Sequence, residues 1–90
     1  MPEIARFYGI IIRMYFRDHN PPHFHAEYQG MKAEYNIQSL EVIEGKLPKR
    51  ANALVLEWAV QHRQELLKNW TNASKPEKLN KIRGIFNFIF

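Results

Sequence analysis

The stretch HFHAEYQGMKAEYN, residues 23–36, contains two segments of alternating apolar and polar residues, joined by Gln29 and Gly30. Such alternation is typical of a strand with one face on a core and the other open to solvent. Glycine tolerates the positive φ angles that tight turns need. The stretch therefore predicts an antiparallel β-hairpin with one apolar and one polar face.

The position of the turn determines which residues of the hairpin face one another. With the turn at these two residues, Glu27 lies opposite Lys32 and His25 lies opposite Glu34. His23 and His25 are two residues apart on one strand, so they share a face, with about 7 Å between their Cα atoms. We expect both imidazoles on the polar face, in contact with solvent.

The same alternation continues in both directions along the chain. Residues 3–8 (EIARFY), 9–18 (GIIIRMYFRD) and 39–45 (SLEVIEG) each predict a further strand. From Pro48 to Pro76 the apolar period changes to three and four, which predicts one long amphipathic helix. We expect an α+β fold: an antiparallel β-meander of four to five strands, with one long C-terminal helix packed on one face.

Length and composition limit the class of protein. The chain has 90 residues, 46% of them hydrophobic, and no cysteine. This size suits a single domain, to which we assign residues 1–82; residues 83–90 (RGIFNFIF) form a hydrophobic tail of unknown role. The absence of cysteine fits a reducing cytosol, and no apolar run reaches the length of a membrane span. We expect a cytoplasmic protein without a signal peptide.

Two surface properties predict partners. The predicted helix has a wide apolar surface and the tail is apolar, which together predict a homodimer or a partner-bound species. The net charge is +4, with a pI near 9.6, a balance that favours nucleic acid or an acidic protein. Arg13, Arg17 and Lys32 are the residues that we expect to contact the phosphates of an RNA.

Asp18, His19, His23 and His25 lie within eight residues, around a double proline. Three interpretations fit them. The side chains could simply solvate an open sheet face. His19, His23 and His25 could hold zinc or another divalent metal, with Asp18 as a ligand or orienting group. The histidines could instead serve as a metal-free acid–base pair that cleaves RNA, with the cationic side chains stabilising the phosphate charge.

The pattern M-P-x-I-x-R-F-x-G-I-x-I-x-M-Y-F-x-D-H-x-P-P-H-F-H resembles the bacterial family of the domain of unknown function 4160. The similarity continues through HAEYQGMKAEYNI, ELLKNW and KLNKI, so it covers residues 1–82, and D-H-x-P-P-H-x-H is its distinctive motif. The resemblance implies a candidate site of Asp18, His19, His23 and His25. It also implies a neighbour-encoded protein of the domain-of-unknown-function 2442 type, an arrangement that suggests a toxin–antitoxin pair.

These observations lead to two hypotheses. The first is a toxin-like component of a bacterial toxin–antitoxin pair that cleaves RNA with the histidine cluster and needs no cofactor. The alternative is a non-catalytic binding module, with or without a histidine-ligated metal.

Overall fold

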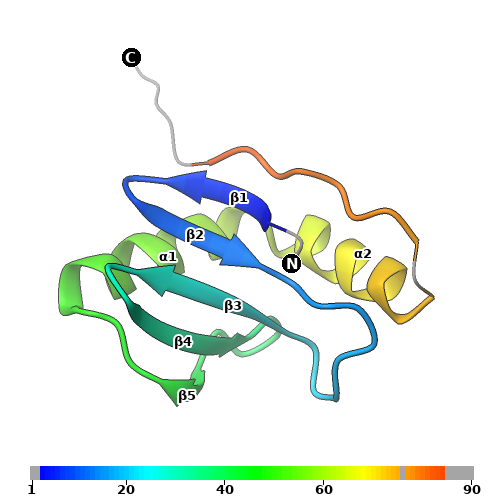
Figure 1. Ribbon diagram of the computed structural model, residues 1–90, viewed down its shortest axis with the longest axis horizontal. Helices are drawn as coiled ribbons and strands as arrows, with labels where there is room; N and C mark the ends of the chain where they lie inside the picture. The colour runs from blue at the N-terminus through cyan, green and yellow to red at the C-terminus, as the bar shows by residue number, and fades with distance from the viewer. Residues whose placement is uncertain (1–2, 76, 85–90) are drawn as a thin grey trace.

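The protein forms one five-stranded antiparallel sheet with two helices on one side of it (Figure 1). The computed structural model describes residues 3–75 and 77–84. The chain runs in the order β1 (Glu3–Phe7), β2 (Ile10–Arg13), β3 (His23–Tyr28), β4 (Met31–Asn36), β5 (Val42–Gly45), α1 (Lys49–Gln61), α2 (Arg63–Ser74). Strands that follow one another in sequence are neighbours in the sheet. The predicted α+β meander is therefore confirmed.

The hairpin of β3 and β4 has the predicted register. Glu27 pairs with Lys32, and His25 pairs with Glu34. Gln29 and Gly30 both have positive φ angles, +48° and +84°, which match the mirror-image turns favoured in two-residue hairpins.

The core lies between the sheet and the helices. The largest fully buried apolar side chains come from every strand except β5, from both helices and from two positions just beyond β2 and β4: Ile4, Ile10, Ile12, Met14, Phe24, Tyr35, Ile37, Val55, Trp58 and Leu66. The Trp58 ring contacts Phe7 and Phe24 at centroid distances of 5.2 and 5.9 Å. Burying an aromatic or branched aliphatic side chain contributes about 2 kcal/mol, so this layer dominates the stability of the fold.

The expectation of one long helix is wrong, because the helical segment is interrupted at His62. This residue has φ −120° and ψ 22°, outside helical values, and its N–H donates to the Ala59 carbonyl. Immediately after the break, Arg63 Nε donates to the Ile37 carbonyl at 3.2 Å, which ties the start of α2 to the chain beyond β4. Neither proline nor glycine marks this position, so the sequence gives no local signal for the break.

The strand predicted from the alternation in residues 9–18 is shorter than expected. β2 ends at Arg13, and although Met14 is buried, Phe16 is 44% exposed. The backbone then turns at Arg17, which has φ +56° and donates its N–H to the Ala73 carbonyl of α2. Residues 14–22 therefore leave the sheet and form a loop, which we call the aspartate loop after Asp18.

The chain after α2 returns past β1 (Figure 1). The Ile82 N–H donates to the Ile4 carbonyl at 2.7 Å, and Trp58 Nε1 donates to the Arg83 carbonyl at 2.8 Å. This segment covers the outer edge of the sheet at β1. Most of the predicted hydrophobic tail, residues 85–90, lies outside the described residues. No helix in the described part of the chain is long and apolar enough to cross a membrane.

Candidate functional site

The aspartate loop carries Asp18 to the N-terminal end of β3. One side of the loop is fixed to α2 by the Arg17 N–H bond to Ala73, at 3.1 Å. The other side is fixed by the Ile37 N–H, which donates to the Pro22 carbonyl at 3.0 Å. The His19 N–H donates to Asp18 Oδ1 at 2.9 Å and orients the carboxylate. Backbone hydrogen bonds thus hold Asp18 in place.

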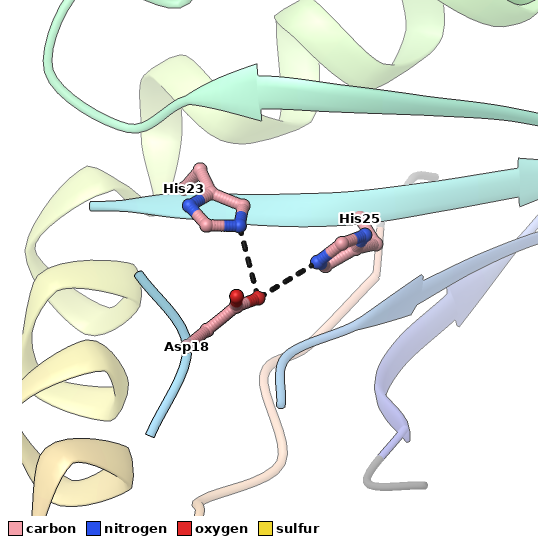
Figure 2. Close-up of side chains that lie close together, drawn as sticks. All are labelled: Asp18, His23 and His25. Atoms are coloured by element: carbon pink, nitrogen blue, oxygen red, sulfur yellow. Dashed lines mark hydrogen bonds and ion pairs between the residues drawn. The ribbon is translucent and has the colours of Figure 1, made fainter. Parts of the chain in front are cut away.

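One oxygen of Asp18 contacts two histidines at once (Figure 2). Asp18 Oδ2 lies 3.0 Å from His23 Nε2 and 3.1 Å from His25 Nε2. Both histidines project from the same side of β3, as their spacing predicts. The donor atoms of these three residues all lie within 4.8 Å of one another, so they form a group that could hold a metal ion.

His23 is buried, which contradicts the expected solvent exposure of both imidazoles. It is 1% exposed, and its ring lies 5.1 Å from that of Trp70 on α2. The aspartate loop and α2 together cover this end of the sheet face. His23 Nδ1 donates to the Pro21 carbonyl at 2.7 Å, since a proline carbonyl can only accept.

His25 lies at the boundary between the cluster and solvent. Its side chain is 25% exposed, and its ring packs against that of Tyr15 in a T-shaped arrangement, with 4.5 Å between centroids. Glu34, opposite it in the sheet, places Oε2 4.0 Å from His25 Nδ1 and Oε1 3.7 Å from His23 Nε2. The predicted hairpin register already placed Glu34 opposite His25, but no role for Glu34 was predicted from the sequence. This register is the signal that could have identified Glu34 as part of the site.

The structure leaves the His19 ring outside this group. Its side chain is 77% exposed, its Nε2 is 3.7 Å from Asp18 Oδ1, and its Nδ1 contacts the Asn20 carbonyl. The His19 and His23 rings are 5.2 Å apart. Asp18, rather than His19, therefore completes the set of converging donor atoms.

Burial alone would raise the pKa of Asp18. The hydrogen bonds from His25 and from the His19 N–H, together with the charges of His23 and His25, outweigh that effect and hold the pKa below its usual range. Asp18 is therefore ionised at neutral pH. An ionised carboxylate and imidazole nitrogens are ligands that zinc and other divalent transition metals accept.

The contact between His23 Nε2 and Asp18 needs either a proton or a cation between the two atoms. A neutral imidazole carries one proton, and in His23 the Pro21 carbonyl keeps it on Nδ1. Nε2 faces an anionic oxygen 3.0 Å away, so it either carries a second proton, which it donates to Asp18, or binds a cation that lies between the two atoms.

Two of the three distances between donor atoms are close to those around a metal ion, and all three donor atoms lie within 4.8 Å of one another. Ligands of a tetrahedral zinc ion lie about 2.0–2.1 Å from the metal and so about 3.4 Å from one another. The two contacts at Asp18 Oδ2, 3.0 and 3.1 Å, need to open by only a few tenths of an ångström. Asp18, His23 and His25 would be the ligands, and the Pro21 carbonyl would fix the tautomer of His23.

The predicted RNA-contacting cations do not form one patch. Arg13 pairs with Glu27 at 3.3 Å, whereas Lys32 is exposed, and the exposed Arg17 lies in the aspartate loop. A cavity of about 220 Å³ adjoins the cluster on the open sheet face; its lining includes Arg13, Tyr15, His25, Lys32 and Glu34. The cavity connects two of the three cations with the partly exposed histidine.

Comparison with known proteins identifies a family. The family model described as domain of unknown function (DUF4160) matches residues 9–71, which include all of the aspartate loop and the β3–β4 hairpin. No curated protein and no solved structure matches the chain. The matched region is more than half of the 90 residues and contains every residue of the cluster; the chain belongs to the DUF4160 family.

Proposed function

We propose that this protein is a divalent-metal-dependent hydrolase whose metal ligands are Asp18, His23 and His25. The observation that carries the proposal is the convergence of three donor atoms: Asp18 Oδ2 lies 3.0 Å from His23 Nε2 and 3.1 Å from His25 Nε2, while the Pro21 carbonyl holds His23 Nδ1. A divalent cation between these atoms would be bound by all three side chains. Zinc is the metal we favour, because its catalytic sites use three protein ligands and keep one position open.

The geometry favours this chemistry over a metal-free pair of catalytic histidines. A general acid or base must come within hydrogen-bond reach of the substrate. His23 is buried, with Nδ1 committed to a backbone carbonyl and Nε2 directed at Asp18. Only His25 has access to the adjoining cavity.

Hydrolysis is the reaction class that the surroundings of the cluster support. A bound metal would lower the pKa of a water molecule and polarise the bond to be cleaved. The chain itself supplies a cavity beside His25 and cations at its border, Arg13 and Lys32. RNA is the substrate we propose, as part of a toxin-like role. Its phosphate contacts would come mainly from Lys32 and Arg17, because Arg13 already pairs with Glu27.

RNA binding of this kind is sensitive to salt. Each phosphate neutralised in a single strand contributes about −0.7 to the slope of log affinity against log salt. We expect Lys32→Ala to reduce the slope by roughly that amount in fluorescence-anisotropy titrations with a short RNA. An affinity that does not change with salt would exclude RNA as the substrate.

A non-catalytic metal module is the second candidate. The burial of His23 against Trp70 favours it, since a metal there would fix the aspartate loop to β3 and to α2. The two candidates differ in one respect. A structural metal has no open position and supports no turnover, whereas the hydrolase needs both an open position and a substrate.

The remaining parts of the proposal concern partners and location. We propose a neighbour-encoded antitoxin-like protein of the domain-of-unknown-function 2442 type as partner, and the cytoplasm as the site of action. Val60, 58% exposed on α1, is apolar surface that such a partner or a second copy would cover. Co-expression of the two neighbouring genes, followed by affinity purification, tests the pair directly.

Metal binding is the decisive experiment. The purified protein is stripped with a chelator and titrated with Zn²⁺ and Co²⁺ by calorimetry, and bound metal is counted by mass spectrometry. We expect one ion per chain in the wild type, and at least about tenfold weaker binding in Asp18→Asn and His25→Ala, since each removes a ligand. His19→Ala is the matched control, because it keeps the backbone N–H that orients Asp18. A wild type that binds no divalent ion would refute the proposal.

A further inference from the structure

We infer that Glu34 is the proton-accepting catalytic residue of this centre, and that the 220 Å³ cavity beside it receives the scissile group of the substrate. The inference rests on the proposed function. It assigns a role to a side chain that is neither a ligand in the Asp18, His23 and His25 group nor part of the D-H-x-P-P-H-x-H motif.

The first argument is the position of Glu34 relative to both histidines. Its Oε1 lies 3.7 Å from His23 Nε2, the atom that faces Asp18, and its Oε2 lies 4.0 Å from His25 Nδ1. These separations exceed those between Asp18 and the two histidines, 3.0 and 3.1 Å. Glu34 therefore lies outside the group of converging donor atoms formed by Asp18, His23 and His25, and next to both histidines of that group.

The second argument is that Glu34 faces both the cluster and the cavity. It lines the cavity together with His25, and its side chain is 23% exposed. Asp18, on the other side of the histidines, is not among the residues that line the cavity. A substrate that enters the cavity would thus meet Glu34 and His25, but not Asp18.

The third argument is that stability does not explain a carboxylate here. Within the described residues, the ion pairs of Glu34 are with His23 and His25, and none is with lysine or arginine. Glu34 also lies directly opposite Glu44 in the β4–β5 register, and like charges in directly opposite positions destabilise a sheet. The position opposite Glu44 therefore provides no favourable charge pair across β4 and β5, which leaves the two histidines as the described partners of this carboxylate.

The chemistry assigned to Glu34 is a proton transfer within one hydrolytic step. Glu34 takes a proton from water while the water oxygen forms a bond to the electrophilic phosphorus. The bond from phosphorus to the leaving oxygen breaks, and Glu34 returns the proton to that oxygen. No oxidant or reductant is needed, and the carboxylate regains its charge at the end of the cycle.

The test separates proton transfer from metal binding. Cobalt-loaded wild type, Glu34→Gln and Glu57→Gln are compared for metal stoichiometry, visible absorption and hydrolysis of bis(4-nitrophenyl) phosphate and a fluorophore–quencher RNA. Glutamine keeps the size of the side chain and removes its ability to accept the proton. Glu57 lies on α1, outside the cluster and its cavity, so Glu57→Gln is the matched control for charge.

We expect Glu34→Gln to bind one cobalt ion with an unchanged spectrum and to lose turnover by about 100-fold or more, as expected when a general base is removed. Glu57→Gln should match the wild type in all measurements. If Glu34→Gln turns over within about threefold of the wild type, or if its cobalt spectrum changes because Glu34 is a ligand, the inference falls and the proposed function stands. A wild type without bound metal, or without turnover of both substrates, overturns both.

Discussion

Replacement of His23 by alanine tests how much this buried histidine contributes to the stability of the fold. If His23 lay on an open sheet face, its removal would change stability by less than about 0.5 kcal/mol, as is usual for surface positions. The structure gives a different expectation. His23 is 1% exposed, packs on Trp70 and donates a 2.7 Å hydrogen bond to the Pro21 carbonyl.

The size of the effect follows from these contacts. Loss of the hydrogen bond leaves a partly buried carbonyl without a protein donor, which costs about 1 kcal/mol. Removal of the buried ring leaves a cavity against Trp70, and truncation of a large buried side chain costs about 2 kcal/mol at the lower end of the measured range. We therefore expect His23→Ala to lower the free energy of unfolding by about 3 kcal/mol in the absence of metal.

Urea unfolding monitored by tryptophan fluorescence measures this directly, with a chelator present in every sample so that metal affinity cannot contribute. For a domain of this size, a loss of 3 kcal/mol corresponds to a fall in melting temperature of roughly 12–24 °C. His19→Ala, at a 77% exposed side chain in the same loop, should stay within about 0.5 kcal/mol of the wild type. If the two variants are equally stable, His23 is not a packed residue and the burial described here is wrong.

Three other measurements test separate parts of the structure. Burial raises the pKa of Tyr35 to about 12, above its unfolded value of about 10. The preference of the folded state for the protonated phenol should therefore contribute about 3 kcal/mol to the free energy of unfolding below pH 10, and this contribution should be lost as pH rises through 12. Urea unfolding across this pH range, with tyrosinate absorbance, measures the loss. Gly45→Ala should lower the free energy of unfolding by about 2 kcal/mol or more, because the φ of Gly45 is +81° and a Cβ there would collide with the Lys32 carbonyl. Gly30→Ala, at a position with open space around it, should lower it by only about 1 kcal/mol, because of the backbone conformation alone. A metal that binds only the folded state stabilises it by about 2.7 kcal/mol when the free metal is at 100 times its dissociation constant. A chelator added to such a sample should therefore lower the melting temperature by roughly 10–20 °C. An unchanged melting temperature would contradict the metal centre.

The sheet was predictable because local rules determine it. Alternation assigned the two strands of the central hairpin, and Gln29 and Gly30 set its turn, so the pairing of His25 with Glu34 followed from counting residues. The same alternation put His23 and His25 on one face of one strand. These features depend on neighbours in sequence, and the sequence contains that information directly.

The burial of the site was not predictable by the same rules. Alternation assigns a residue to a face but does not say what covers that face. Here the chain leaves the sheet after Arg13, and the aspartate loop lies over the end of β3, held to α2 by the Arg17 N–H. The interruption at His62 depends in the same way on contacts between distant segments, such as that of Arg63 with Ile37. Tertiary contacts of this kind leave no periodic signal in the sequence.

The residues of the D-H-x-P-P-H-x-H motif differ in whether they contribute side-chain or backbone atoms to the site. Asp18, His23 and His25 contribute side-chain atoms to the cluster, whereas His19 contributes its backbone N–H to the Asp18 carboxylate. Pro21 and Pro22 contribute carbonyls, one to His23 Nδ1 and the other to the Ile37 N–H. Proline suits these positions because it presents a carbonyl and has no N–H that needs a partner.

This division changes what the motif implies. Taken as a pattern of letters, it presents three histidines as equivalent ligands or catalysts. In the fold, a single carboxylate oxygen faces two imidazole nitrogens, and the third imidazole points into solvent. The loop residues hold that carboxylate in position by backbone hydrogen bonds, which would remain after replacement of His19 by any residue except proline. The chemistry of the site therefore depends on Asp18, His23 and His25, and on Glu34 at the edge of the cavity, which the motif does not contain.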